Sequence, residues 1–257
     1  MSDARRDIEG LRVACVYSWG CPELNCLAAK KLDPNPAERV FNFAQDPARE
    51  PSDLIHCIML NLETFWFYRL ICLLNEKEGD VFLEEIVRAH WLPNSDSVLE
   101  LLKQVPSSDI GKLLGSLDLL RGSHRLLSIV SKIRNIAGTR PHHNSIIIQL
   151  FKGINPKQLP AVLLKDSEKC LVRTAKVTKV FNHTLEVQAI SLTINERGEL
   201  SYVFSEEQVD RGFVSSVKES DLISIHLGVA REKITAKDAQ RLTAINEEAI
   251  CFAAKGP

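Results

Sequence analysis

The sequence predicts a multidomain α+β protein, with an all-α N-terminal domain followed by a small five-stranded OB-like β-barrel and a C-terminal helix. In the first half of the chain, apolar residues recur at three- and four-residue spacing, which is typical of amphipathic helices. Beyond Lys169, apolar and polar residues alternate and β-branched residues become frequent, as in strands. Pro156 and Pro160 interrupt regular structure between the two patterns. The predicted parts are a helical domain over 1–152, a linker over 153–168, and the barrel with its helix over 169–257.

The helical domain is expected to contain a helix that begins at Ser52, where Ser52 and Asp53 can cap its N-terminus. One side of this helix is apolar and consists of Ile55, Met59, Leu62, Trp66 and Leu70. The apolar run Phe65–Leu74 is interrupted by Arg69 and is about half of the roughly 20 residues that cross a bilayer. We therefore predict a buried helix in this run and not a membrane span.

Further helices are predicted along the first half of the chain. One starts at Asn94 and stops at Pro106. Another helical region starts near Ser107 and, after a break, resumes at Leu126. The segment 138–144 has no periodic pattern and is rich in turn residues, so we predict a loop there.

Five strands are predicted in the C-terminal part, enough to close a small Greek-key barrel. They span Leu171–Phe181, Thr184–Ile194, Leu200–Phe204, Gly212–Val217 and Leu222–Leu227. Gly198 supplies a turn residue that can adopt positive φ between the second and third strands. Thr235 and Asp238 then form a capping-box pattern ahead of an amphipathic helix. We expect that helix to pack on the barrel or on a partner.

Charge and cysteine content exclude several classes of protein. Lys and Arg total 32, and Asp and Glu total 33, so we expect neither nucleic acid nor a membrane as a partner. The polar N-terminal residues do not show the apolar stretch of a secretory signal. Seven cysteines, an odd number without repeated spacing, favour reduced thiols and a cytoplasmic location. The partners should be proteins or small ligands.

Two short segments mark the ends of the predicted barrel. Residues 170–177 read Cys-Leu-Val-Arg-Thr-Ala-Lys-Val and open the first strand. Residues 222–230 read Leu-Ile-Ser-Ile-His-Leu-Gly-Val-Ala and close the last strand. They resemble the Cys-Leu-Ala-x-Pro-x-Lys-Val opening and the Asp-Tyr-Val-Leu-Val-His-x-Gly-Phe-Ala ending of the HypC/HupF family of NiFe-hydrogenase maturation chaperones. The chain departs from that family pattern in having its cysteine inside the chain and in lacking the proline.

The resemblance implies a metal-centre assembly factor, a chaperone and not an enzyme. In that family the opening cysteine and the strand-end histidine hold iron that carries cyanide and carbon monoxide as transient cargo. These roles fall on Cys170 and His226 in this chain. A soft thiolate and a borderline imidazole suit such a metal, and so few ligands leave positions open for transfer. The implied partners are an iron-sulfur maturation protein or a hydrogenase large-subunit precursor.

The simpler interpretation of the same two residues is that Cys170 is a packed core residue and that His226 is only hydrogen-bonded. Topology offers a way to choose between the two interpretations. The first predicted strand starts at Cys170 and the last ends at His226, so antiparallel pairing of these strands would bring the two residues together.

Other parts of the sequence support different functions. The helical half resembles only uncharacterised bacterial proteins, through Tyr17–Cys26, His90–Asn94 and Pro141–Asn144. The adjacent His142 and His143 could ligate a metal or act as acid and base near pH 7, although histidines in a polar loop are more commonly solvated or structural. With Arg140 they define an alternative, a metal-dependent hydrolase or nuclease. A third interpretation keeps the barrel without a metal, as a protein-interaction module.

Overall fold

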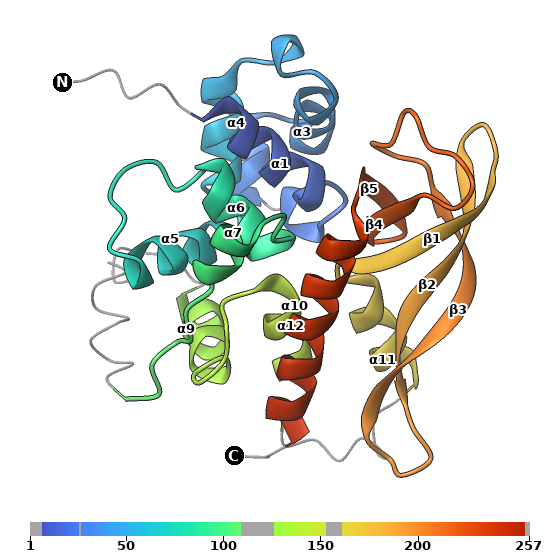
Figure 1. The fold of residues 1–257 in the computed structure, drawn as a ribbon. Coiled ribbons are helices and arrows are strands. Elements are labelled where there is room, and N and C mark those ends of the chain that lie inside the picture. The colour runs from blue at the N-terminus through green and yellow to red at the C-terminus, as the bar shows by residue number, and fades with distance from the viewer. Residues whose placement is uncertain (1–6, 26, 109–125, 153–160, 255–257) are drawn as a thin grey trace. The chain divides into compact units, whose positions relative to one another are not determined.

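The computed structural model describes residues 7–25, 27–108, 126–152 and 161–254, which form an α+β structure (Figure 1). The chain divides into two compact units, Met1–Arg134 and Asn135–Pro257. Over its described residues the first unit is helical, whereas the second combines helices with a five-stranded sheet. The division falls earlier in the chain than the predicted linker over 153–168. Of that linker, residues 153–160 lie outside the described residues, and the remainder is helical.

The first unit packs its helices around aromatic and branched side chains, which are largely withdrawn from solvent. Its α-helices are α1 (Ile8–Ser18), α2 (Leu27–Leu32), α3 (Pro36–Gln45), α4 (Ser52–Met59), α5 (Thr64–Leu74), α6 (Glu84–Trp91), α7 (Asp96–Glu100) and α9 (Leu126–Asn135). Short 3-10 helices lie at Pro22–Asn25 and Pro47–Arg49. The apolar faces of the longer helices form this core, as their spacing predicts.

One carboxylate connects the beginnings of α1 and α6. The Asp7 Oδ1 accepts the Gly10 N–H at 2.8 Å, while its Oδ2 accepts the Glu84 N–H at 2.9 Å. Both donors lie in the first turn of a helix, where N–H groups have no intrahelical acceptor. Gly10 permits the close approach, because a Cβ at this position would lie 1.8 Å from the Phe82 carbonyl oxygen. The two segments therefore meet backbone against backbone.

The single helix predicted from Ser52 is two helices, α4 and α5, with an 87° bend between them. Leu62 lies in the bend and is buried, so the apolar spacing continues through the turn and does not reveal it. The predicted cap is wrong, since the N-cap residue is Pro51, whose side chain cannot accept a hydrogen bond. Among the described residues, no single helix is long and apolar enough to span a membrane, and α4 with α5 passes that test only as a bent pair.

The remaining helix predictions have mixed outcomes. The buried helix predicted over Phe65–Leu74 is confirmed by α5. The helix predicted from Asn94 to Pro106 is much shorter, since α7 ends at Glu100. It starts after Ser95, whose Oγ accepts the Val98 N–H at 3.2 Å. The resumed helix at Leu126 is confirmed by α9. Most of the helical region predicted from Ser107 falls on residues 109–125, outside the described part of the chain.

The described part of the second unit contains its sheet and three further helices, α10 (His143–Gln149), α11 (Ala161–Lys169) and α12 (Ala236–Ala254). The strands are β1 (Arg173–Val180), β2 (Thr184–Ile194), β3 (Leu200–Asp210), β4 (Leu222–His226) and β5 (Val229–Lys233). Neighbours pair in the order β1-β2-β3-β5-β4, and β4 also pairs with β1, so the sheet closes on itself. Figure 1 shows α12 beside α10, with β2 and β3 forming a long hairpin.

Among the described residues of this unit, two apolar clusters stabilise the fold. The first fills the sheet interior with small and branched side chains from several strands, including Val177, Leu185, Val187, Ile223 and Ile225. The second lies where the far half of the β2–β3 hairpin meets the helices, and it includes Ile148, Phe151, Leu192, Ala249 and Ala253. In the first half of β2 the odd-numbered residues Leu185 and Val187 face the first cluster. Further along the strand Leu192, on its other face, joins the second cluster.

One of the five strand predictions is wrong. Residues 212–217 form a loop that runs beside β5, with the Phe213 N–H donating to the Ala230 carbonyl at 3.1 Å. Val214 and Val217 are buried from this loop, and such β-branched residues are typical of strands. The true fifth strand, Val229–Lys233, follows a two-residue turn after β4.

The final helix begins as the sequence predicts. The Asp238 carboxylate accepts the Thr235 backbone N–H at 2.9 Å, and the Thr235 Oγ1 accepts the Asp238 N–H at 3.2 Å. This reciprocal pair is a capping box. It confirms the predicted start of α12, whose buried face packs on α10 and on the sheet.

Candidate functional site

The start of β1 and the end of β4 lie next to each other in the closed sheet. The two strands are antiparallel, with Arg173 opposite Ile225. Just beyond that pair, the Leu227 N–H donates to the Lys169 carbonyl at 2.7 Å. Cys170 and His226 therefore lie at the same end of the sheet, as expected from topology. Cys170 is partly exposed, whereas His226 is buried.

His143, the first residue of α10, contacts both of these positions. Its Nε2 lies 2.8 Å from the Cys170 carbonyl oxygen. A carbonyl can only accept, so this nitrogen carries a proton and donates. The His143 and His226 rings meet edge to face, with centroids 5.2 Å apart and planes at 83°. Of the four candidate metal ligands predicted from the sequence, the structure thus brings together Cys170, His226 and His143.

Asn144 holds α10 against the start of β1. Its carboxamide pairs with the backbone of Val172 as a neighbouring strand would, accepting the N–H at 2.8 Å and donating to the C=O at 2.7 Å. The same Nδ2 donates to the Asn246 Oδ1 on α12, also at 2.8 Å. Asn144 is buried, so these bonds are made away from water. This residue positions His143 beside Cys170, and sequence reasoning missed it.

His142 has a different role from its neighbour. It is the N-cap residue of α10, and its Nδ1 accepts the Asn144 N–H at 3.1 Å. It is also completely buried, so of the two predicted roles for these loop histidines, solvated or structural, His142 has the structural one. The sequence did contain a signal for this cap. An apolar run begins at Ile146, and a polar residue a few positions before such a run often caps a helix.

A buried arginine supports the end of β4. The Arg231 Nε and Nη2 donate to the His226 carbonyl oxygen at 3.2 and 2.8 Å, and its guanidinium carbon lies 5.7 Å from the centre of the Phe213 ring. Leu227 and Gly228 both have positive φ, 55° and 73°, and make the tight turn to β5. A left-handed conformation costs a residue such as Leu227 about 1 kcal/mol. The position of the His226 backbone is therefore fixed by the Arg231 hydrogen bonds and by the Leu227–Gly228 turn.

The cysteines differ in their surroundings. Cys57 and Cys251 are exposed, whereas Cys15 and Cys72 are buried. Burial raises the pKa of the Cys15 thiol, and it raises the pKa of Cys72 to about 11, so both remain protonated near neutral pH. Within the described ranges, no group of three or more His, Cys, Asp or Glu side chains is arranged to hold a metal ion. A site built on Cys170 and His226 would have two protein ligands.

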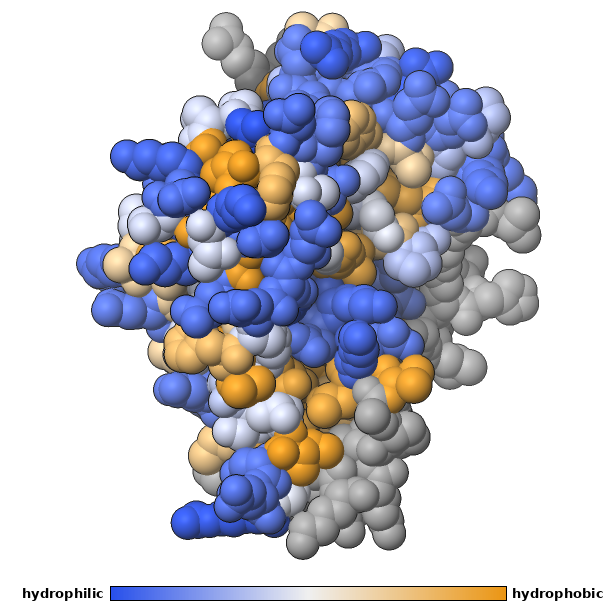
Figure 2. All heavy atoms as spheres, turned by 90° about the vertical axis from the view of Figure 1, so that its right-hand side faces the viewer, coloured by the Kyte–Doolittle hydropathy of each residue, from blue (hydrophilic) through white to orange (hydrophobic). Residues whose placement is uncertain are grey.

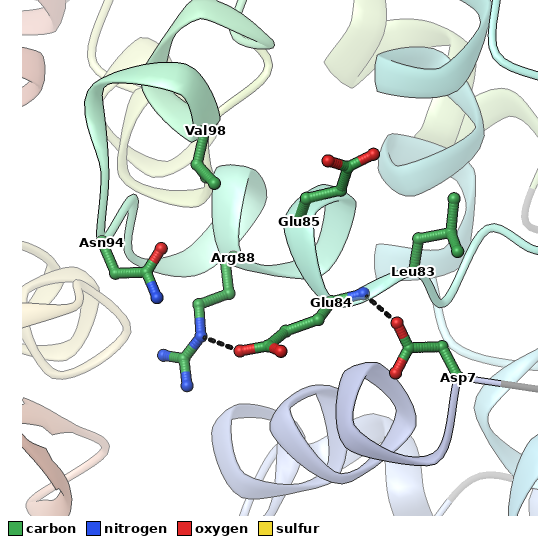
Figure 3. A pocket seen from close by; sticks show the side chains of 7 residues that line it. All are labelled: Asp7, Leu83, Glu84, Glu85, Arg88, Asn94 and Val98. Carbon is green, nitrogen blue, oxygen red and sulfur yellow. Dashed lines mark hydrogen bonds and ion pairs between the residues drawn. The ribbon is translucent and has the colours of Figure 1, made fainter.

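A separate hollow of about 380 Å³ lies in the first unit, at the start of α6 (Figure 3). Its lining comprises Asp7, Leu83, Glu84, Glu85, Arg88, Asn94 and Val98. Its charged side chains are already engaged, because Asp7 accepts the Glu84 N–H, the Arg88 Nε donates to the Glu84 carboxylate at 2.9 Å, and Glu85 pairs with Lys77. These interactions explain the residues as parts of the helix junction.

Arg140, the third residue of the hydrolase interpretation, also has a structural partner. Its Nε donates to the Glu248 carboxylate of α12 at 2.9 Å. This ion pair connects the segment before α10 to the final helix. Arg140 and His142 thus both contribute to the packing of α10.

Searches of the curated proteins and of the solved structures find no match to this chain. A protein-family model does match, over residues 50–255, which span parts of both units and well over half of the chain. The chain therefore belongs to the Family of unknown function (DUF6390).

Proposed function

We propose that this protein is a metal-centre carrier of the HypC/HupF type, built on an OB-like barrel in its second unit. Cys170 and His226 would bind iron carrying cyanide and carbon monoxide, and release it to a partner. That partner would be an iron-sulfur maturation protein or the large-subunit precursor of a NiFe-hydrogenase. The proposal places the protein in the cytoplasm, where the reduced Cys170 thiol would persist.

The observation that carries this proposal is the convergence of Cys170 and His226 at one end of the closed sheet. They are far apart in the chain, yet the Leu227–Lys169 backbone hydrogen bond and the His143 side chain connect their neighbourhoods. Cys170 is partly exposed, so its thiol has access to an incoming metal. Two ligands suffice for a carrier, since a closed four-ligand site would resist transfer.

His143 would control access to the buried imidazole of His226. Its ring lies against that of His226 and its Nε2–H donates to the Cys170 carbonyl. In the proposal the His143 ring moves aside when cargo binds, and it returns when cargo leaves. The required motion is a side-chain rotation, because Asn144 keeps the start of α10 fixed to β1.

The test is to purify the protein anaerobically from cells that assemble NiFe-hydrogenase and to record its infrared spectrum. Metal-bound cyanide and carbon monoxide absorb where protein groups do not, so the loaded carrier should show their bands. Cys170→Ala and His226→Ala should abolish the bands. Cys251→Ala is the matched control, since that cysteine is exposed on α12, and its bands should remain.

Hydrogen exchange of the strand amides would verify that each variant keeps its fold. Absence of the bands from the wild-type protein would overturn the proposal, as would bands that survive Cys170→Ala. Metal-dependent hydrolysis lost in His143→Gln would instead favour the hydrolase alternative.

A further inference from the structure

One strand of the closed sheet has an open edge. β3 pairs with β2 along its whole length, from Leu200 to Asp210. On its other side, within the described part of the chain, its ladder contact is the single parallel pair Asp210–Val229. The edge from Leu200 to Val209 therefore carries backbone groups that no described strand meets.

The direction of these backbone groups follows from one hydrogen bond. The Asp210 N–H donates to the Gly228 carbonyl at 2.9 Å, and so points away from β2. In an antiparallel pair, successive residues direct their N–H and C=O groups to alternate sides. The even-numbered residues of β3 thus present their backbone groups at the open edge, and these are Tyr202, Phe204, Glu206 and Gln208.

The open edge carries exposed apolar side chains. Phe204 is 67% exposed and Val203 is 50% exposed, and they lie on opposite faces of the strand. Tyr202, on the same face as Phe204, packs with the cluster that contains Ala249 and Ala253 of α12, so Phe204 is the first residue beyond that cover. Figure 2 shows apolar atoms gathered on the lower part of a mostly hydrophilic face.

Exposed edges are usually protected by Lys or Pro residues, which oppose pairing with another chain. β3 reads Leu-Ser-Tyr-Val-Phe-Ser-Glu-Glu-Gln-Val-Asp and contains neither residue. Its charged residues, Glu206, Glu207 and Asp210, all lie in the second half of the strand. The first half, with exposed Phe and Val, is therefore suited to strand addition.

The charged residues of β3 indicate which kind of partner strand would bind at its open edge. A hollow of about 400 Å³ across β1, β2 and β3 is lined by Thr178, Glu186, Val187, Glu206 and Glu207. Glu207 is paired with the buried Arg173. Glu206 and Glu186 lie on the same sheet face as Phe204 and are exposed. Lys179 lies opposite Glu186 on β1, so Glu206 is the acidic side chain of that face on the strand with the open edge. A basic side chain in the added strand would complement Glu206.

We propose that the open edge of β3 binds an extended segment of a partner protein. The segment adds to the sheet by backbone hydrogen bonds, with an apolar residue opposite Phe204 and a Lys or Arg two positions along, opposite Glu206. Successive same-face residues in a strand are two apart, so one short segment reaches both. This surface lies within the second unit and does not depend on the Cys170–His226 proposal.

The test uses the full chain and a synthetic peptide of alternating Thr with Val and Lys, so that Val and Lys share one face. NMR amide exchange gives the residue-specific readout. At saturation, the amides of Phe204 and Glu206 should exchange about tenfold more slowly or better, because they gain acceptors. The amides of Val203 and Ser205, which already face β2, should change little.

Glu206→Lys provides the variant control, since Glu206 is exposed and its replacement does not disturb a core. It should weaken binding of the Lys peptide about tenfold and strengthen binding of a matched peptide with Glu in place of Lys. Phe204→Ser should weaken both peptides.

Failure of the Lys peptide to protect Phe204 and Glu206 would overturn the proposal, and so would equal binding of the Lys and Glu peptides. Sedimentation equilibrium tests a second copy as the occupant. A wild-type dimer that Glu206→Lys leaves intact and Phe204→Lys separates would assign the edge to self-association and would also reject a basic partner segment.

Discussion

In the first unit His90 lies among aromatic rings, whereas in the second unit His143 and His226 lie against each other and beside a backbone carbonyl. The His90 ring is 5.7 Å from Phe67, 5.2 Å from Tyr68 and 5.0 Å from Trp91, measured between ring centroids. Both His90 and His226 are buried. Burial alone therefore does not distinguish a packing histidine from a candidate ligand.

The neighbours make the distinction. The aromatic surroundings of His90 supply edge and face contacts of the kind that stabilise a core. Around His226, the contacts come from another titratable ring, from a chain reversal and from the Arg231 side chain on its own carbonyl. Such surroundings hold a polar side chain in one place, as a binding site requires.

The two units also join distant segments differently. The first unit brings α1 to the start of α6 by removing a side chain at Gly10, so that backbone meets backbone. The second brings α10 to β1 by adding a side chain, Asn144, that imitates a strand. Substitutions at these two positions test whether the units are stabilised independently.

The largest effect is expected for Gly10→Ala. The added Cβ would lie 1.8 Å from the Phe82 carbonyl oxygen and 2.6 Å from the Glu84 nitrogen, and backbone atoms cannot rotate away. We expect the first unit to lose about 3 kcal/mol of unfolding free energy. Tryptophan fluorescence during denaturation measures this, because Trp19, Trp66 and Trp91 all lie in the first unit.

Gly79→Ala is the control for backbone strain. Gly79 has φ of 112°, but nothing lies within 4 Å of its ideal Cβ. Its substitution should cost about 2 kcal/mol through backbone strain alone, without a steric clash. Equal losses at Gly10 and Gly79 would show that close packing of α1 on α6 is not what stabilises the unit.

A smaller effect is expected for Asn144→Ala in the second unit. The substitution leaves the buried N–H and C=O of Val172 without the partner they now have, and it also removes a bond to Asn246. We expect a loss of about 2 kcal/mol. Hydrogen exchange of the strand amides should report it, while the tryptophan transition of the first unit stays unchanged.

Asn182→Ala provides the matched control, since Asn182 is exposed in the turn after β1. That variant should change stability by less than about 0.5 kcal/mol. If Asn144→Ala also shifted the tryptophan transition, the two units would unfold as one and the comparison between them would lose its basis.

Local patterns in the sequence predicted a large part of the second unit. β2 spans the predicted residues, Thr184–Ile194, and the Thr235–Asp238 capping box is present. Both features depend on interactions between residues close together in the chain, and such interactions can be predicted from a single sequence. The strand predicted at Gly212–Val217 failed because β-branched residues can also be buried from a loop. β5 was missed because its sequence, Val-Ala-Arg-Glu-Lys, has one β-branched residue and three charged ones.

The candidate site was predictable in part. The pairing of the first strand with β4 follows from sheet closure, so the approach of Cys170 to His226 could be anticipated. The participation of His143 could not, because it depends on how α10 packs against β1 through Asn144. Arg231 was missed for a different reason, because its bond to the His226 carbonyl crosses the turn between β4 and β5, and β5 was not predicted.

The smallest effect concerns pH and a partly exposed ion pair of the second unit. Asp221 accepts from the Lys233 ammonium at 2.9 Å and from the Lys218 N–H at 2.8 Å, and these bonds lower the pKa of its carboxyl below 3.8. A carboxyl whose pKa is lower in the folded state adds stability above its unfolded pKa, and this stability is lost as the pH falls through the folded value. We therefore expect thermal denaturation below about pH 4 to show an acid-side loss in the wild-type protein that is weaker in Asp221→Asn. High salt should reduce the difference, because Lys233 is exposed and its charge is screened. Identical acid-side slopes for the two proteins would contradict a stabilising role for Asp221 and would leave the turn before β4 dependent on its backbone bonds alone.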